Sequence, residues 1–156
     1  MTLFLSTFIN KIDKKGRVSV PSSYRSYLQN EDFTGIVIYK SFLNNCIEAC
    51  SLERIKTLNK LIDEMEPFSE DRDALATIIL GASIQLQFDT EGRVVLPQDI
   101  IDSIGISEQV CFVGKGTTFE IWNPKEFENY KQITFEKIKN NKSLLNLKSP
   151  SAISKV

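Results

Sequence analysis

Hydrophobic and polar side chains alternate along two stretches of the chain that share one design. Each stretch leads into the same short motif, DKKGRVSVP at residues 13–21 and DTEGRVVLP at residues 89–97, so that Asp89 follows Asp13 by 76 positions. Alternation with a period of two is typical of a half-buried β-strand. The sequence therefore predicts two equivalent strands, whose matched positions are Phe8 with Ile84, Asn10 with Leu86, and Ile12 with Phe88.

The motif itself predicts a tight turn in each copy. An Asp at its first position and a Gly at its fourth are the preferred residues of a type I turn that ends in a left-handed glycine. After the turn the alternation resumes, and a proline then ends each strand. We expect each copy to form a hairpin whose turn is organised by Asp13 and Gly16, or by Asp89 and Gly92.

The similarity of the copies extends beyond the turns. Each copy continues with a short helical stretch and two strand-like runs, and each closes where a new helix is predicted to begin, at Ser51 and at Asn123. Gly105 is expected to cap the second short helix. The strand-like runs are GIVIYKS and CIEAC in the first copy, and VCFVGKG and TFEIW in the second.

A helical segment separates the copies, and another follows them. Apolar side chains between the copies recur at helical spacing, with a break at Pro67 and a new start at Ser69. A further helix is predicted from Pro124 to about Lys139. The expected parts are a first half-domain at 1–50, a helical insert at 51–82, a second half-domain at 83–123, a C-terminal helix at 124–140 and a flexible tail at 141–156.

Composition and size indicate how the halves combine. With 42% hydrophobic and 25% charged residues, the 156-residue chain is typical of a folded globular protein. A half-domain of roughly 45 residues buries too little surface to be stable alone, so we expect both halves to share one core with pseudo-twofold symmetry. The early run LFLSTFI lacks a positive flank and a cleavage pattern, and is expected to be neither a signal peptide nor a membrane span.

Residue types that carry enzymatic chemistry are scarce. The chain has no histidine, which removes the commonest general base and the commonest neutral metal ligand. Cys46, Cys50 and Cys111 follow no disulfide framework and fall short of the four ligands that zinc needs, so buried free thiols in a reducing cytosolic compartment are expected. We therefore expect no enzyme activity, no cofactor and no metal site.

The arginine after each turn glycine has two interpretations. In the structural one, Arg17 and Arg93 pair with Asp13 and Asp89 or cover the strand ends. In the functional one, both turns project an arginine toward a repetitive anion such as duplex DNA. Arginine can hold a phosphate there, or read guanine in the major groove, which admits a two-stranded ribbon.

Charge favours the first turn as the stronger anion site. The net charge is −1 and the pI is about 5.6, which argues against a protein that coats nucleic acid through bulk positive charge. Residues 1–40, however, carry six basic and three acidic side chains, whereas residues 41–82 carry four and eight. The neighbours that strengthen the first turn are Lys11, Lys14 and Lys15, and the one that weakens the second turn is Glu91.

The doubled motif resembles a known family. Two tandem DxxGR motifs, within DKKGRVSVPSSYR and FDTEGRVVLP, flank a helical pair that contains ALATIILGAS. In this arrangement, over roughly residues 4–140, the chain resembles the MraZ family, bacterial proteins of the AbrB-like swapped-hairpin superfamily. The resemblance implies an α+β fold in which two tandem pseudo-symmetric half-domains form a double-split β-barrel, and a ring of identical subunits.

The resemblance also implies a function. It points to a sequence-specific DNA-binding transcriptional regulator, cytoplasmic and nucleoid-associated, that acts on the division and cell wall gene cluster through direct repeats in a promoter, with repression as the favoured direction. The partners implied are double-stranded DNA and further copies of the chain, with no membrane and no small-molecule substrate. The DNA-binding candidates by position in the motif are Lys15, Arg17 and Arg93, to which Lys14 and Lys11 are added for their charge.

An alternative from another class is a protein-interaction or antitoxin-like module that uses the helical insert at 51–82. The amphipathic helices permit this, although covering the barrel and joining neighbours in a ring is the simpler use. Steep salt dependence of binding to promoter DNA would favour the regulator. The sequence leaves open the number of subunits, the operator and its spacing, repression versus activation, and whether Glu91 silences the second turn.

Overall fold

The computed structural model describes residues 3–29 and 32–147 of the chain. These residues fall into two compact units, one ending at Pro124 and one starting at Lys125, and each is described by itself. The strands of the first unit are β1 Thr7–Lys11, β2 Arg17–Ser19, β3 Gly35–Lys40, β4 Ile47–Cys50, β5 Ile84–Gln87, β6 Arg93–Val95, β7 Gln109–Gly114 and β8 Phe119–Trp122. Its helices are α1 Ser22–Arg25, α2 Leu52–Asp63, α3 Glu70–Leu75, the π-helix η1 Ala76–Gly81 and α4 Gln98–Ser103.

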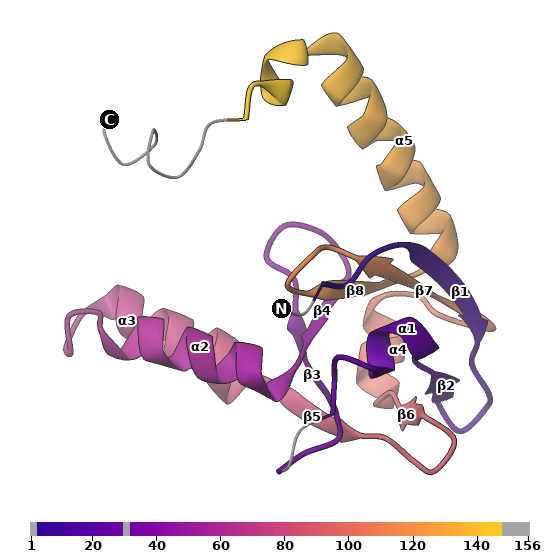
Figure 1. Ribbon diagram of the computed structural model, residues 1–156, viewed down its shortest axis with the longest axis horizontal. Helices are drawn as coiled ribbons and strands as arrows, with labels where there is room; N and C mark the ends of the chain where they lie inside the picture. The colour runs from indigo at the N-terminus through magenta and orange to yellow at the C-terminus, as the bar shows by residue number, and fades with distance from the viewer. Residues whose placement is uncertain (1–2, 30–31, 148–156) are drawn as a thin grey trace. The chain divides into compact units, whose positions relative to one another are not determined.

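The first unit has an α+β fold with two antiparallel sheets (Figure 1). The larger sheet has the strand order β1-β7-β8-β4-β3-β5, and the smaller one consists of β2 and β6. The matching strands of the two halves are β1 and β5, β2 and β6, β3 and β7, and β4 and β8. If each strand is replaced by its match and the order is then reversed, the same strand order results. The sheets therefore have the pseudo-twofold symmetry that the repeated motif predicted.

The two halves are joined by exchanged strands. Strand β1 of the first half pairs with β7 of the second, and β5 of the second half pairs with β3 of the first. The counterpart strands β4 and β8 pair with each other at the centre of the large sheet, and β2 pairs with β6 in the small one. Neither half can complete its sheets without the other.

The prediction of two hairpins is wrong in one respect. Both turns close as expected, because the Asp N–H donates to the Arg carbonyl oxygen at 3.0 Å in the first motif and at 2.9 Å in the second. Strands β1 and β2, however, form no ladder with each other: they are joined by an isolated bridge between Ile12 and Val18 and by a hydrogen bond from the Asn10 side chain to the Ser19 carbonyl oxygen. A two-stranded hairpin is marginally stable in water, whereas pairing with the other half lets both strands of each motif bury side chains in a common core.

One apolar core connects the halves. Val18 and Val94, opposite each other in the small sheet, are each 1% exposed, and they belong to the same cluster as the inward side chains of the large sheet. Aromatic rings fill its centre, where the Phe119 ring lies 4.9 Å from those of both Phe4 and Tyr24 between centroids. Phe119 and Trp122, the first and last residues of β8, are both buried.

Local signals determine several helix ends. The hydroxyls of Ser51 and Ser69 accept the backbone N–H groups of Arg54 and Arg72 at 3.1 and 3.2 Å, so both serve as the predicted N-caps of α2 and α3. Gly105 follows α4 with φ +67°, the left-handed conformation expected of a C-capping glycine. The insert continues from α3 as the π-helix η1, which the helical periodicity did not predict.

The second unit is helical. Helix α5 Pro124–Asn140 begins at the predicted proline and ends one residue after the expected Lys139, and the short 3₁₀ helix η2 Lys142–Leu145 follows it within the expected tail. The rest of that tail, residues 148–156, lies outside the described residues. No helix in the described part of the chain is long and apolar enough to span a membrane.

Replacing Phe4 by Ala is expected to destabilise the protein strongly. Phe4 is fully buried, and its backbone forms a bridge with Gly116. Removing a buried phenylalanine side chain typically costs about 3–5 kcal/mol. Urea unfolding followed by circular dichroism would measure the loss. The neighbouring Leu5→Ala variant is the control, because Leu5 is 64% exposed, and similar losses in both variants would contradict this account of the core.

Candidate nucleic-acid interface

The small sheet presents one face to the core and the other to the outside. Its register pairs Arg17 with Val95, Val18 with Val94, and Ser19 with Arg93. Because side chains alternate across a strand, the buried Val18 and Val94 share the inner face. The four other side chains share the outer face, which we call the ribbon face: Arg17, Ser19, Arg93 and Val95.

The ribbon face brings the two motif arginines together. Arg17 and Arg93 are diagonal neighbours across β2 and β6, a relation that places Cβ atoms about 7 Å apart. Their side chains are 36% and 28% exposed. The hydrogen bond to Asp89 is the largest cause that raises the pKa of Arg93, and the charge of Asp13 in the first turn makes a smaller contribution in the same direction. The two turns therefore lie close together, and both arginines face outward.

In the first turn, Asp13 organises the backbone and holds the arginine. Its Oδ1 accepts the backbone N–H groups of Lys15 at 3.0 Å and of Arg17 at 2.9 Å. Its Oδ2 accepts Nε–H of Arg17 at 2.6 Å. The backbone N–H of Arg17 is the largest cause that lowers the pKa of Asp13. The carboxylate thus stays charged and fixes the direction of the guanidinium, whose Nη atoms it leaves unused.

The second turn repeats this geometry with one difference. Asp89 Oδ1 accepts the N–H groups of Glu91 and Arg93 at 2.8 and 2.9 Å, and Asp89 Oδ2 accepts Nε–H of Arg93 at 2.8 Å. Here, too, the backbone N–H of the arginine is the leading cause that lowers the pKa of the carboxyl. In addition, the Glu91 carboxylate lies 3.4 Å from Nη2 of Arg93. Each arginine thus pairs with the aspartate of its own turn, and among the described residues Arg93 has a second carboxylate partner that Arg17 lacks.

Both turn glycines are required by conformation and by space. Gly16 and Gly92 have φ values of +84° and +76°, which are unfavourable for other residues. A Cβ on Gly16 would also lie 2.7 Å from the carbonyl oxygen of Leu96, and one on Gly92 would collide with the guanidinium of Arg25. Arg25, on helix α1, was not among the predicted site residues, although it lies inside the quoted motif DKKGRVSVPSSYR.

The three predicted lysines occupy different places. Lys14 and Lys15 lie in the first turn with exposed side chains, next to Arg17. Lys11 is the last residue of β1, on the large sheet, where it lines a polar hollow together with Glu108 and Gln109. Lys14 and Lys15 therefore add charge to the first turn itself, whereas Lys11 has a carboxylate beside it.

The thiols are buried, as predicted. All three cysteines are free and buried, and burial is the main cause that raises the pKa of Cys46 and of Cys50 to about 12. The thiols of Cys46 and Cys50 are therefore protonated and unreactive at neutral pH. In the described part of the chain, no group of three His, Cys, Asp or Glu side chains could hold a metal ion.

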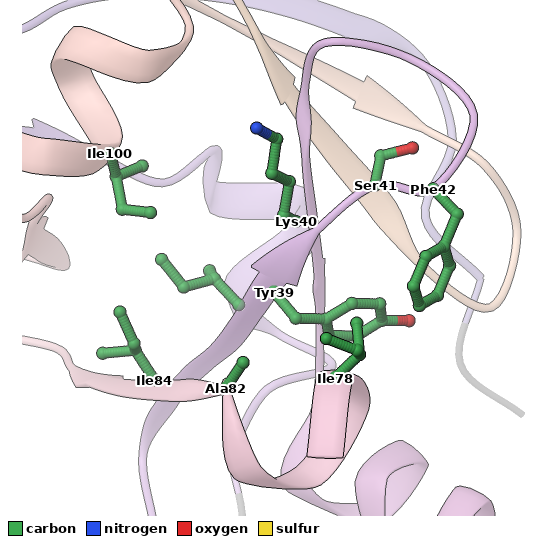
Figure 2. A pocket seen from close by; sticks show the side chains of 9 residues that line it. Tyr39, Lys40, Ser41, Phe42, Ile78, Ala82, Ile84 and Ile100 are labelled. Carbon is green, nitrogen blue, oxygen red and sulfur yellow. The ribbon is translucent and has the colours of Figure 1, made fainter. Parts of the chain in front are cut away.

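A second surface feature is an apolar groove of about 340 Å³ beside β3, which Figure 2 shows with its lining side chains. It is lined by the end of β3 and Phe42, by Ile78 and Ala82 of the insert, and by Ile84 and Ile100. Lys40 and Ile100 line the groove, and their counterparts in the other half are Gly114 and Tyr24, which both contact the buried Phe4. In the first half, the chain before β5 forms the helix η1. Among the described residues, no side chain therefore fills the place that corresponds to that of Phe4, and the groove lies there.

The fold and the site together define a protein of two interlocked half-domains that presents paired Asp-Gly-Arg turns on one exposed ribbon. A family model described as "MraZ protein, putative antitoxin-like" matches residues 3–74 and 78–145. The chain belongs to the MraZ family, as its doubled motif predicted.

Similar proteins of three Rickettsia species carry the name transcriptional regulator MraZ. The protein of Rickettsia bellii (strain OSU 85-389) is 56% identical over 131 residues, which cover 83% of this chain and 87% of the relative. That of Rickettsia canadensis (strain McKiel) is 51% identical over 141 residues, covering 88% and 95%. That of Rickettsia africae (strain ESF-5) is 52% identical over 130 residues, covering 83% and 87%. The name of these relatives is that of a regulator and is not the name of an enzyme class.

Replacing both turn aspartates by asparagine, Asp13→Asn with Asp89→Asn, is expected to reduce the loss of stability in acid. Both carboxyl groups have a folded pKa below their ordinary value of 3.8. A carboxyl with a depressed folded pKa contributes stability that is present above its unfolded pKa and is lost as pH falls through its folded pKa. Urea unfolding midpoints should therefore decline less below about pH 4 in the double variant than in the wild type. Parallel profiles would contradict the role of the two carboxylates.

Proposed function

We propose that the chain is a transcriptional regulator that binds double-stranded DNA through its ribbon face. The observation that carries the proposal is the placement of Arg17 and Arg93 on one exposed face of a two-stranded ribbon. The major groove of B-DNA admits such a ribbon, and an arginine can donate two hydrogen bonds to guanine or to a phosphate there. The names of the relatives support the regulatory role.

The turn geometry supports the proposal energetically. A free arginine side chain loses much rotamer freedom when it binds, and this loss reduces affinity. Asp13 and Asp89 already hold both guanidinium groups through Nε, so less freedom remains to be lost. The first turn is the stronger contact in this proposal, because Lys14 and Lys15 add charge there, whereas Glu91 lies against Arg93 in the second turn.

The promoter target, the direction of regulation, the location in the cell and the type of barrel are proposed from the family resemblance. The site would act on direct repeats in the promoter of the division and cell wall gene cluster, as a repressor, in a cytoplasmic and nucleoid-associated protein. We propose a double-split β-barrel for the two half-domains at 1–50 and 83–123, which the strand exchange supports. The insert at 51–82, the C-terminal helix at 124–140 and the tail at 141–156 complete the proposed division.

We also propose that the chain assembles into a ring. Few cationic groups per protomer make few phosphate contacts, which give weak binding at physiological salt. Identical sites held at half-site spacing, about 10 bp, gain affinity through effective concentration. Exposed apolar side chains that a neighbouring copy could cover support assembly, among them Phe68 at 99%, Ile133 at 68% and Phe135 at 66% exposure.

A protein-interaction module remains the second candidate, and the groove beside β3 is the observation that favours it. The corresponding place in the second half is filled by an aromatic side chain of the chain itself, Phe4. A second copy could fill the first-half groove in the same way during assembly. The groove is therefore compatible with the regulator and requires no separate partner.

Arg17→Ala is expected to weaken binding to the DNA upstream of the protein's own gene at least tenfold, because a bidentate contact to guanine or phosphate is lost. Electrophoretic mobility shift would measure binding, and circular dichroism would check the fold. Lys60→Ala is the control, since it removes an exposed cation from helix α2, outside the ribbon face. An unchanged shift with Arg17→Ala would refute the proposed contact.

Ile78→Glu is expected to lower the assembly state, because it places a charge in the apolar groove where its side chain is 44% exposed. Size-exclusion chromatography with light scattering would show a smaller mass than that of the wild type. Asn59→Glu, which adds the same charge on the exposed face of α2, is the control. Equal masses for all three proteins would exclude the groove as an assembly contact.

A further inference from the structure

A third guanidinium lies against the second turn. A Cβ built on Gly92 would collide with Nη1 and Cζ of Arg25 and would lie 2.8 Å from its Cδ. Arg25 is the last residue of α1, so this side chain belongs to the first half and covers the turn of the second. The second turn is therefore completed by a cation that its own motif does not contain.

The guanidinium of Arg25 has no partner among the residues that the structure describes. No carboxylate in residues 3–29 and 32–147 lies within ion-pair distance of it, and its Nε is buried without a hydrogen-bond acceptor. Leaving a polar group buried and unpaired is unfavourable for folding. A role in folding alone therefore does not explain why an arginine occupies this position.

The pseudo-symmetry of the fold supplies an internal comparison. The residue 76 positions after Arg25 is Ile101, which covers Gly16 of the first turn, with its Cδ1 3.4 Å from the place of a Cβ. Ile101 is 9% exposed. An apolar side chain thus performs the same packing in the other half, so the positive charge of Arg25 is not needed to cover a turn glycine.

The charges of the two turns show where this extra cation matters. The first turn carries Lys14 and Lys15 between its Asp and its Arg, whereas the second carries Thr90 and Glu91. Glu91 also lies 3.4 Å from Nη2 of Arg93. Without Arg25, the second turn would present more negative than positive charge to an anion.

We propose that Arg25 is a phosphate-binding residue of the second turn, which contacts the backbone of the DNA bound by the ribbon face. The inference rests on the proposed function. Arg25 belongs to helix α1 and not to the ribbon, so its contact is assigned to the phosphates and not to base edges. Phosphate contacts position a protein on DNA and carry no sequence information.

The test compares Arg25→Met and Arg25→Lys in the full-length protein. Methionine keeps an apolar stem over Gly92, as Ile101 does over Gly16, but removes the charge, whereas lysine retains it. The affinity for two DNA duplexes would be measured at several salt concentrations. One duplex is the DNA upstream of the protein's own gene, and the other is a scrambled duplex of the same length. Arg25→Gln is the second neutral variant, should Arg25→Met fail to fold.

The neutral variant is expected to bind both duplexes several-fold more weakly. The slope of log affinity against log salt concentration should decrease in magnitude by about one for each bound protomer, because one phosphate contact is lost. Arg25→Lys should retain the slope, and thermal unfolding should stay at the wild-type midpoint. Arg17→Ala should instead lose more affinity for the upstream duplex than for the scrambled one.

Two other results would overturn the inference in distinguishable ways. If a folded neutral variant keeps the wild-type slope on both duplexes while Arg17→Ala weakens binding, Arg25 is a packing residue only, and the proposed function stands. If the wild-type protein binds neither duplex at low salt, the proposed function and this inference fail together.

Discussion

The exchange of strands between the two halves is the constraint on which the rest of the structure depends. Because β1 pairs with β7 and β5 with β3, each half supplies the edge strand of the other. A chain segment of roughly 45 residues could not bury enough apolar surface by itself, and the exchange makes one core from both. The same exchange pairs β2 with β6, which brings the two turns side by side. Folding and the formation of the ribbon face are therefore one event.

The same three residues of the turn motif organise the turn and form the site of the proposed DNA contact. The Asp satisfies two backbone N–H groups and orients the Arg, and the Gly adopts a backbone conformation that other residues disfavour. The symmetry of the backbone is not matched by symmetry of charge. Lysines flank the first arginine, Glu91 lies against the second, and Arg25 reaches the second turn from the other half. Two geometrically equivalent turns can thus differ in their attraction for an anion.

The sequence predicted the local features well, because they depend on residues close to one another. The turns, the N-caps at Ser51 and Ser69 and the C-capping Gly105 all formed as expected. The hairpins were the error, since alternation identifies a strand but not its partner. A strand pairs where it buries most apolar surface, and here that place lies in the other half. The π-helix η1 was also missed, and it leaves the groove where a counterpart of Phe4 would lie.

The sequence by itself determined the repeat, the turn chemistry, the alternating strands and the family, because each of these depends on short-range spacing or on residue identity. The tertiary structure alone decided that Arg17 and Arg93 share one face and that Arg25 lies against Gly92. These relations join residues about 70 positions apart. They arise only when the halves interlock, since the pairing partner of each strand depends on the burial of the whole core and not on its own sequence.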